Sequence, residues 1–265
     1  MTRVLGVGLL TGWGDGVAAL PDDARHAAGG RPIVPLATPE LSGDRFRRAT
    51  RECLLGVAAV AAALRESGVD RAAVAGPQTA LVYVTAAAYG ASNKNFILAT
   101  SRSAARTEGG PPYFPYTAPS ALPAEVAIEF GLTGGYVILV GGAVATVDAL
   151  WQASRLLAAG RATMALVLAV ETFAECADLW ARGRWTTPQP LVEAAACAVL
   201  SGDGEDVAYG PGEVSTLETL AAQRAGETLA CAPLIGLALA RAGAMPSARV
   251  TGSWRGRRAQ IAVGT

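Results

Sequence analysis

The sequence predicts an α/β layered fold, because strand-like and helix-like segments alternate over residues 1–170. Runs of Val, Leu, Ile and Ala mark the strands, apolar residues at three- and four-residue steps mark the helices, and glycines follow the helix ends. The expected strands are 4–10, 79–85, 136–140 and 164–170, and the expected helices are 44–67, 95–106, 124–130 and 146–159.

The longest expected helix, residues 44–67, shows the clearest amphipathic pattern. Its apolar stripe consists of Leu54, Val57, Ala58, Ala61 and Leu64. Gly68 stands where a C-terminal cap is expected. The strand Tyr136–Val140 has no polar face, which predicts a central or an interfacial position.

The chain is less regular outside these elements. Residues 21–43 are rich in Pro, Gly and Asp and are expected to form a loop. The later expected elements are a helix at 175–183, a strand at 191–200, a Gly- and Asp-rich loop at 201–213, a buried helix at 234–242 and a last strand at 257–263.

The composition favours a large buried core and a sizeable oligomer interface. Hydrophobic residues make up 51% of the chain and charged residues 17%, against a usual charged share of about 25%. A bias towards Ala and Gly is the alternative explanation. The net charge is zero, and no basic block interleaved with aromatic residues indicates nucleic-acid binding. The apolar runs are shorter than the ~20 residues that span a bilayer, and no signal peptide is evident, so we expect a cytoplasmic protein.

The cysteines do not suggest a metal site. Cys53, Cys176, Cys197 and Cys231 lack metal-ligand spacing and lie in apolar or mixed runs, so we expect buried thiols.

Other chemistry-bearing residues are few. The only histidine, His26, precedes a Gly-rich segment and is expected in an exposed loop. The acidic residues Glu171, Glu175 and Asp178 are expected to be solvated or paired with nearby arginines. The Gly-rich stretch at 12–16 does not lead into a helix, so it is interpreted as a turn and not as a phosphate-binding loop.

Three segments resemble a known family when they are taken in order. They are 113–120 (YFPYTAPS), 131–146 (GLTGGYVILVGGAVAT) and 159–171 (AGRATMALVLAVE). Their order and spacing are similar to a β-ketoacyl synthase of the thiolase fold. The resemblance implies a layered thiolase-like fold with a complete N-terminal half in residues 1–200. Residues 201–265 would be a truncated C-terminal half that completes the same domain.

In that family a strand ends in a sharp turn that carries a nucleophilic cysteine, and a buried helix follows. Counting back from residues 154–160, which resemble the end of that helix, places the cysteine position on Ala143. The family's two histidines lie in its C-terminal half, whereas His26 lies near the N-terminus. The resemblance therefore implies a chain that is not an enzyme by itself.

The loss of the nucleophile resembles the chain-length factors, the partner subunits of ketosynthases in type II polyketide systems. The resemblance implies a heterodimer with a catalytic ketosynthase and an indirect interaction with an acyl carrier protein. It implies no cofactor and no metal, nucleic-acid or membrane partner. Such a subunit forms part of the wall that ends the acyl tunnel.

Two sets of site residues follow from this resemblance. The chain-length gate is assigned to Phe96, with Asn95, Ile97, Ala99 and Thr100 beside it. The dimer interface is assigned to the strand before the turn, that is Tyr136, Val137, Ile138, Leu139, Val140 and Gly141. Ordinary core packing is the alternative role for Phe96. The alternative functions are a stand-alone ketosynthase-like acyltransferase that uses other residues, and a homodimeric carrier-binding scaffold.

Overall fold

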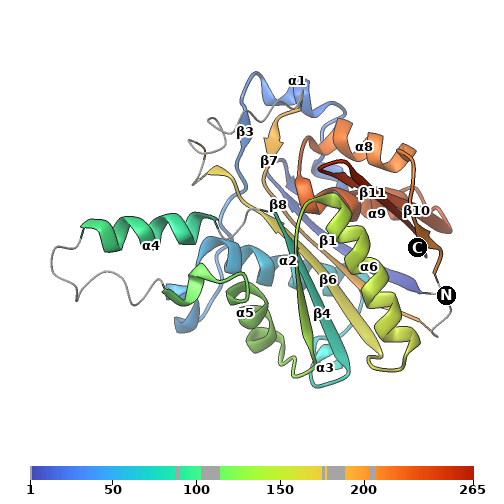
Figure 1. Ribbon diagram of the computed structural model, residues 1–265, viewed down its shortest axis with the longest axis horizontal. Helices are drawn as coiled ribbons and strands as arrows, with labels where there is room; N and C mark the ends of the chain where they lie inside the picture. The colour runs from blue at the N-terminus through green and yellow to red at the C-terminus, as the bar shows by residue number, and fades with distance from the viewer. Residues whose placement is uncertain (1, 87–89, 103–113, 175–176, 178–188, 203–206) are drawn as a thin grey trace.

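The computed structural model describes residues 2–86, 90–102, 114–174, 177, 189–202 and 207–265 (Figure 1). The expected helix at 175–183, together with Cys176 and Asp178, lies almost entirely outside these residues. Within them, one nine-stranded sheet runs in the order β10-β11-β1-β8-β6-β4-β5, with β2 beside β1 and β9 beside β11. Its strands are β1 (Arg3–Thr11), β2 (Gly14–Asp15), β4 (Thr79–Thr85), β5 (Tyr136–Val140), β6 (Met164–Glu171), β8 (Ala194–Ser201), β9 (Tyr209–Gly210), β10 (Ser247–Trp254) and β11 (Arg257–Gly264).

Helices cover both faces of the sheet (Figure 1). The α-helices of the described residues are α1 (Ala24–Ala28), α2 (Arg51–Ser67), α3 (Arg71–Val74), α4 (Gly90–Arg102), α5 (Ala121–Phe130), α6 (Ala143–Ala158), α8 (Thr216–Ala225) and α9 (Ala232–Ala242). The smaller elements are β3 (Ile33–Val34), β7 (Leu191–Val192), η1 (Val17–Ala19), η2 (Asp44–Arg48), η3 (Phe114–Thr117) and η5 (Leu229–Cys231).

Alternating side chains of the central strands build two separate cores. In β4, Val82 and Val84 join the core under α6 and α9, whereas Leu81 and Tyr83 join the core under α2 and α5. β4, β5 and β6 are parallel to one another, and β8 is antiparallel to β6 and to β1. Strands covered on both faces are expected to be continuously apolar, which explains why β4 and β6 contain so few polar residues.

The residues after position 200 extend the same sheet. The β10–β11 hairpin joins the sheet beside β1 through the parallel pair Arg3 and Gly264. The sheet curls, so that α6 packs against β4 and β6 and also against β10 and β11. The helix that follows β5 is therefore enclosed by strands from the middle and from the C-terminal end of the chain.

Several predicted elements are confirmed, two of them with unchanged bounds. The strands expected at 79–85 and 136–140 are β4 and β5. Gly68 adopts a left-handed conformation, with φ 66°, and its N–H binds the carbonyl of Arg65 at the end of α2. Of the two positions predicted for the strand Tyr136–Val140, the central one is wrong, because β5 lies at an edge of the sheet, and the interfacial one stays a prediction.

The continuous helix predicted over 44–67 is wrong in its first turns. The structure has a separate 3-10 helix, η2, and then α2, because Ala49 and Thr50 adopt extended conformations. Thr50 bonds through its hydroxyl to Cys53, a local bond that competes with helix continuation. The expected loop at 21–43 also contains α1 and β3. The longest elements that were not predicted are α8 and β10.

No helix in the described part of the chain is both long enough and apolar enough to cross a membrane.

Candidate functional site

The predicted strand–turn–helix unit is present around Ala143. β5 ends at Val140, Gly141 and Gly142 make the turn, and α6 begins at Ala143. The N–H of Gly141 donates to the carbonyl of Thr85 at 2.9 Å, which fixes the turn beside the end of β4. Ala143 is half-buried at the positive end of a 16-residue helix. Its role as a lost nucleophile position stays a prediction.

The β10–β11 hairpin packs directly on this turn. A Cβ atom added to Gly142 would lie 2.3 Å from Cε3 of Trp254, and one added to Gly252 would lie 2.6 Å from the carbonyl carbon of Ala143. Contacts this short exclude any side chain at either position without a shift of the hairpin. The Trp254 ring therefore covers the turn from the side of the C-terminal residues.

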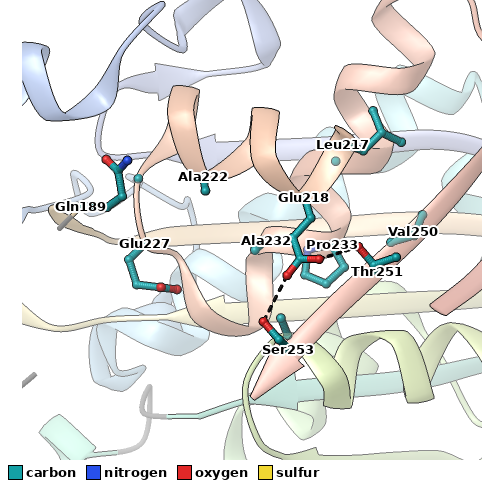
Figure 2. Close-up of a pocket in the computed structure, with 13 residues that line it drawn as sticks. Gln189, Leu217, Glu218, Ala222, Glu227, Ala232, Pro233, Val250, Thr251 and Ser253 are labelled. Atoms are coloured by element: carbon teal, nitrogen blue, oxygen red, sulfur yellow. Dashed lines mark hydrogen bonds between the residues drawn. The ribbon is translucent and has the colours of Figure 1, made fainter. Parts of the chain in front are cut away.

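Two pockets open beside Ala143. The first, of about 100 Å³, lies between α8, α9 and β10 and is lined by Glu218, Glu227 and Ser253 among others (Figure 2). The second, of about 370 Å³, shares Ala143, Glu227 and Ser253 with the first and continues along Trp254 to the tip of the hairpin. Ala143 thus lies where the two pockets meet.

Glu218 is fully engaged at the wall of the first pocket. It is the third residue of α8, and its backbone N–H donates to the hydroxyl of Ser215, the N-cap of that helix. Its carboxylate accepts hydrogen bonds from the Thr251 hydroxyl at 2.6 Å, the Ser253 hydroxyl at 3.1 Å and Arg258 Nη1 at 2.9 Å. Figure 2 shows the first two of these bonds. Both hydroxyls therefore serve to hold α8 on β10.

Glu227 is the second acidic side chain of the pocket and lies in the turn after α8. Burial raises the pKa of its carboxyl, and the charge of Glu218 raises it further, whereas a hydrogen bond from the Leu229 N–H at 3.0 Å opposes the shift. Leu229 itself has a positive φ of 47°, a strained backbone in a buried turn. The strained turn thus holds, beside Ala143, a carboxyl whose pKa is raised by burial.

The described cysteines are poor candidates for a nucleophile. Cys53, Cys197 and Cys231 are buried, as predicted, and they form no disulfide. Burial raises the pKa of the Cys53 thiol to about 12 and raises the pKa values of the other two well above their ordinary range. A thiol is nucleophilic only as the thiolate, so these three behave as small apolar side chains. His26 is exposed on α1, and its backbone N–H donates to the carboxylate of Asp23, the N-cap of that helix.

Two of the buried carboxylates outside the pockets, Glu193 and Glu171, serve the fold. Glu193 accepts the N–H groups of Leu36, Phe173 and Ala174 at 2.7, 2.6 and 2.7 Å and pairs with Arg51. Burial alone would raise the pKa of Glu193, but the bonds from Arg51 and the three amides outweigh burial and lower it.

The second of these carboxylates is Glu171, which is not solvated, whereas Arg182 and Arg184, the arginines of the alternative prediction, lie outside the described residues. Glu171 is fully buried at the end of β6 and accepts the N–H of Ala86 at 2.6 Å. Glu171 thus supplies an acceptor for the half-buried amide of Ala86 in the connection after β4, which gives this buried charged residue a role in the fold.

The predicted interface strand has an open edge. β5 pairs with β4 on one side, and no other described strand lies on its outer side. Tyr136 and Val140 are 46% and 58% exposed, and Val137, Ile138 and Leu139 are half-buried. Gly141, the last predicted interface residue, lies in the turn. Unpaired apolar edges promote association between chains, so this edge is suited to a partner.

The predicted gate residues lie on α4, which projects from the body of the molecule (Figure 1). Phe96 is half-buried, and its ring centroid lies 5.7 Å from that of Phe114 in η3, at an angle of 57°. Ile97 is 61% exposed. Thr100 is exposed, and its hydroxyl donates to the carbonyls of Phe96 and Ile97. The side chains of Asn95 and Ala99 lie outside the described part of the structure.

A comparison with protein families matches residues 35–204 to the family described as "Beta-ketoacyl synthase, N-terminal domain". This range covers more than half of the 265 residues, so the chain belongs to the β-ketoacyl synthase family. The family predicted from the order of motifs around Ala143 is confirmed. A comparison with curated proteins found no significant sequence match.

Solved structures share the fold at low sequence identity. "The ishigamide ketosynthase/chain length factor" matches with a TM-score of 0.74 and 17% identity over 98% of both chains. "AntDE:AntF (apo): type II PKS acyl-carrier protein in complex with its ketosynthase bound to the hexaketide" matches with a TM-score of 0.80 and 15% identity over 100% of this chain and 99% of that chain. "Ketosynthase (ApeO) in Complex with its Chain Length Factor (ApeC) from Xenorhabdus doucetiae" matches with a TM-score of 0.63 and 13% identity, again over 100% and 99%. The predicted thiolase-like fold is confirmed.

Proposed function

We propose that this chain is a non-catalytic chain-length-factor subunit, which forms a heterodimer with an active ketosynthase and shapes the acyl tunnel of a type II polyketide synthase. One observation carries the proposal. The strand–turn–helix unit of the family is intact, yet its helix begins with Ala143 and its turn is covered by Trp254. A methyl group cannot accept an acyl chain, so the unit serves a purpose other than acyl transfer.

The pockets beside Ala143 support a non-catalytic role. Acyl transfer needs a nucleophile and a base within hydrogen-bond reach of each other. In the first pocket, the hydroxyls of Thr251 and Ser253 donate to Glu218, and a carboxylate is a weak base for a hydroxyl of much higher pKa. The stand-alone acyltransferase therefore has no support from these side chains.

The proposed interface uses the open edge of β5. A second strand laid against Tyr136–Val140 would pair the free backbone groups of this edge and cover its two exposed apolar side chains. Two of the similar structures are named as pairs of a ketosynthase and a chain length factor, and one as a ketosynthase complex with an acyl carrier protein. We take the same kinds of partner for this chain.

The proposed gate limits the length of the acyl chain by steric exclusion. An acyl chain that grows from the partner's cysteine would cross the interface and meet Phe96 and its neighbours on α4. Each methylene forced against a packed wall costs about 1–3 kcal/mol, enough to stop growth within one or two cycles. The apolar character of Phe96 and Ile97 favours a reduced, polyene-like chain over a polyketone.

The proposal is tested by co-expression with the ketosynthase encoded beside it, followed by size-exclusion chromatography with mass determination. We expect a stable one-to-one complex, and we expect the chain to be insoluble or self-associated when it is expressed alone. A soluble homodimer that does not bind the ketosynthase would overturn the proposal. It would favour the homodimeric scaffold, because the β5 edge could also pair with a second copy of this chain.

A further inference from the structure

The side of β1 that faces away from β8 is open over most of its length. β8 pairs with β1 from Arg3 to Thr11. On the opposite side, β11 pairs only at Arg3, and β2 pairs only at Leu10 and Thr11. Within the described part of the chain, the middle of β1 therefore has a neighbouring strand on one side only. Backbone groups on such an edge need partners from elsewhere.

Other groups satisfy this open edge near its two ends. The carbonyl of Leu9 accepts a hydrogen bond from the N–H of Gly16 at 2.8 Å. Arg241, near the end of α9, donates to the carbonyls of Val4 and Leu5 at 2.6 and 2.7 Å. The guanidinium of Arg241 thus takes the place of a neighbouring strand.

Val7 lies between these two satisfied stretches. Backbone groups of successive residues in an antiparallel pair point to opposite sides of the strand. Because Leu9 binds Gly16 on the outer side, Val7, two residues earlier, also directs its N–H and C=O outward. Among the described residues, no donor or acceptor binds these two groups. Val7 is only 7% exposed, and buried backbone groups are paired as a rule, so the two groups require a ligand or ordered water.

A pocket of about 380 Å³, the β1 pocket, lies along this edge between α2 and α9. The two helices pack on opposite faces of β1 (Figure 1). Val7, Leu9, Ala62 and Ala238 give the pocket a buried apolar wall. Its volume falls within the range of small-molecule sites, about 300–1,000 Å³. It shares no lining residue with the two pockets beside Ala143.

The charged side chains of the β1 pocket balance one another. Asp15 and Glu66 are acidic, and Arg65 and Arg241 are basic. Arg241 is bound to the carbonyls of β1, whereas the other three side chains are exposed and therefore lie at the mouth. Exposed charges contribute little to binding. The pocket therefore favours a ligand without net charge.

We propose that the β1 pocket binds a small uncharged molecule of the N-acyl amino acid amide class, which pairs with Val7 as a one-residue strand. In an antiparallel pair, one residue exchanges two N–H···O bonds with the residue opposite it. A single amino acid residue of the ligand can therefore satisfy both free groups of Val7, while its side chain contacts the apolar wall.

The site does not rest on the proposed function. β1 lies inside the sheet, whereas β5, the proposed interface strand, lies at its end. The failure of the ligand site and the failure of the heterodimer are therefore separate results.

The test uses the full chain in its soluble form, which is the complex with the ketosynthase or, if that complex does not form, the homodimer. The probe is N-acetyl-leucine N-methylamide, and saturation-transfer NMR measures its binding. We expect saturable binding that changes little with salt, because the probe is uncharged. Hydrogen exchange, measured by mass spectrometry, should slow in the peptide that contains Val7. Absence of saturable binding, or unchanged exchange in that peptide, would overturn the site.

Two methylated probes test the pairing with Val7. Methylation of the leucine nitrogen removes the N–H that would donate to the Val7 carbonyl, so we expect about tenfold weaker binding. Methylation of the terminal amide nitrogen is the control, because this group faces away from β1 in the proposed pairing. It should leave the affinity unchanged. Equal binding of all three probes would contradict the pairing.

A pair of variants tests the location. Ala242→Trp places a large side chain at the pocket, where Ala242 is the exposed last residue of α9, so we expect the loss of saturable binding. Ala73→Trp on α3 is the control, because Ala73 is also an exposed helical alanine and lines none of the three pockets. Both variants should keep the melting temperature of the native chain. Undiminished binding by the Ala242 variant would contradict the location.

Discussion

The two parts of the β5–α6 unit differ in their accessibility. The edge of β5 is open and presents Tyr136 and Val140 to solvent. The turn that follows is covered, because Trp254 and Gly252 of the hairpin pack against Gly142 and Ala143. A working acyl-transfer site requires access to the turn, whereas a partner subunit requires access to the edge. The edge is open to solvent, whereas Ala143 at the start of α6 is reached through the two pockets beside it.

The largest effect is expected from Val140→Lys, which places a charge on the open edge. If this edge is the interface, the complex buries an unpaired ammonium at a cost of roughly 3 kcal/mol or more, which weakens binding at least about 100-fold. Co-purification with the ketosynthase measures the loss.

Val214→Lys is the matched control for this change, because Val140 and Val214 are both 58% exposed and Val214 lies beside α8. It should leave the complex intact. An intact complex with Val140→Lys would show that another surface forms the interface.

The covered turn is tested by Gly142→Ala. The new methyl group would overlap the Trp254 ring, so we expect a loss of about 1–3 kcal/mol in the free energy of unfolding. Denaturant unfolding measures this loss. Gly135→Ala is the control, because a Cβ at Gly135 meets no atom within 4 Å.

A double variant tests the cause of this loss. In a Trp254→Ala background, Gly142→Ala should cost much less than in the native chain, because the clashing ring is absent. Equal costs in the two backgrounds would mean that the hairpin does not cover the turn in solution.

A smaller effect is expected from Phe96→Ala on α4. In a reconstituted synthase, removal of the ring should lengthen the product by one or two extension cycles, read by mass spectrometry of the released chains. Phe46→Ala on η2 serves as the control, since Phe46 is also half-buried and lies in a different element. A product of unchanged length would leave Phe96 with a packing role against Phe114.

The sequence predicted those features that depend on neighbouring residues. The continuous apolar runs of β4 and β5 and the glycine after α2 were sufficient to place these elements. The break before α2 was missed because Ala49 ends η2 and Thr50, which begins α2, makes a local side-chain bond to Cys53.

The pockets could not be predicted, because they join residues that are distant in the chain. Glu218, Glu227 and Ser253 reach Ala143 only after β10 packs on α6. Glu193 did carry a signal, since it is a lone acid in the apolar run 191–200, and such an acid requires a partner when buried. The partner, Arg51, lies 142 positions earlier, and nothing local indicates it.

The smallest effect concerns Glu227, beside the covered turn of the β5–α6 unit. It appears only in how the free energy of unfolding depends on pH. Burial raises the pKa of Glu227 above its ordinary value of 4.5. Between 4.5 and the raised value, the native state holds more protons than the unfolded state, so the free energy of unfolding falls as pH rises. Glu227→Gln does not titrate, and its amide oxygen still accepts the Leu229 N–H. The stability difference between variant and native chain should therefore be constant below pH 4.5, grow above it and level off beyond the raised pKa. Urea unfolding from about pH 4 to pH 8 measures this difference; parallel curves across the range would mean that water reaches Glu227 and that the turn beside Ala143 is open.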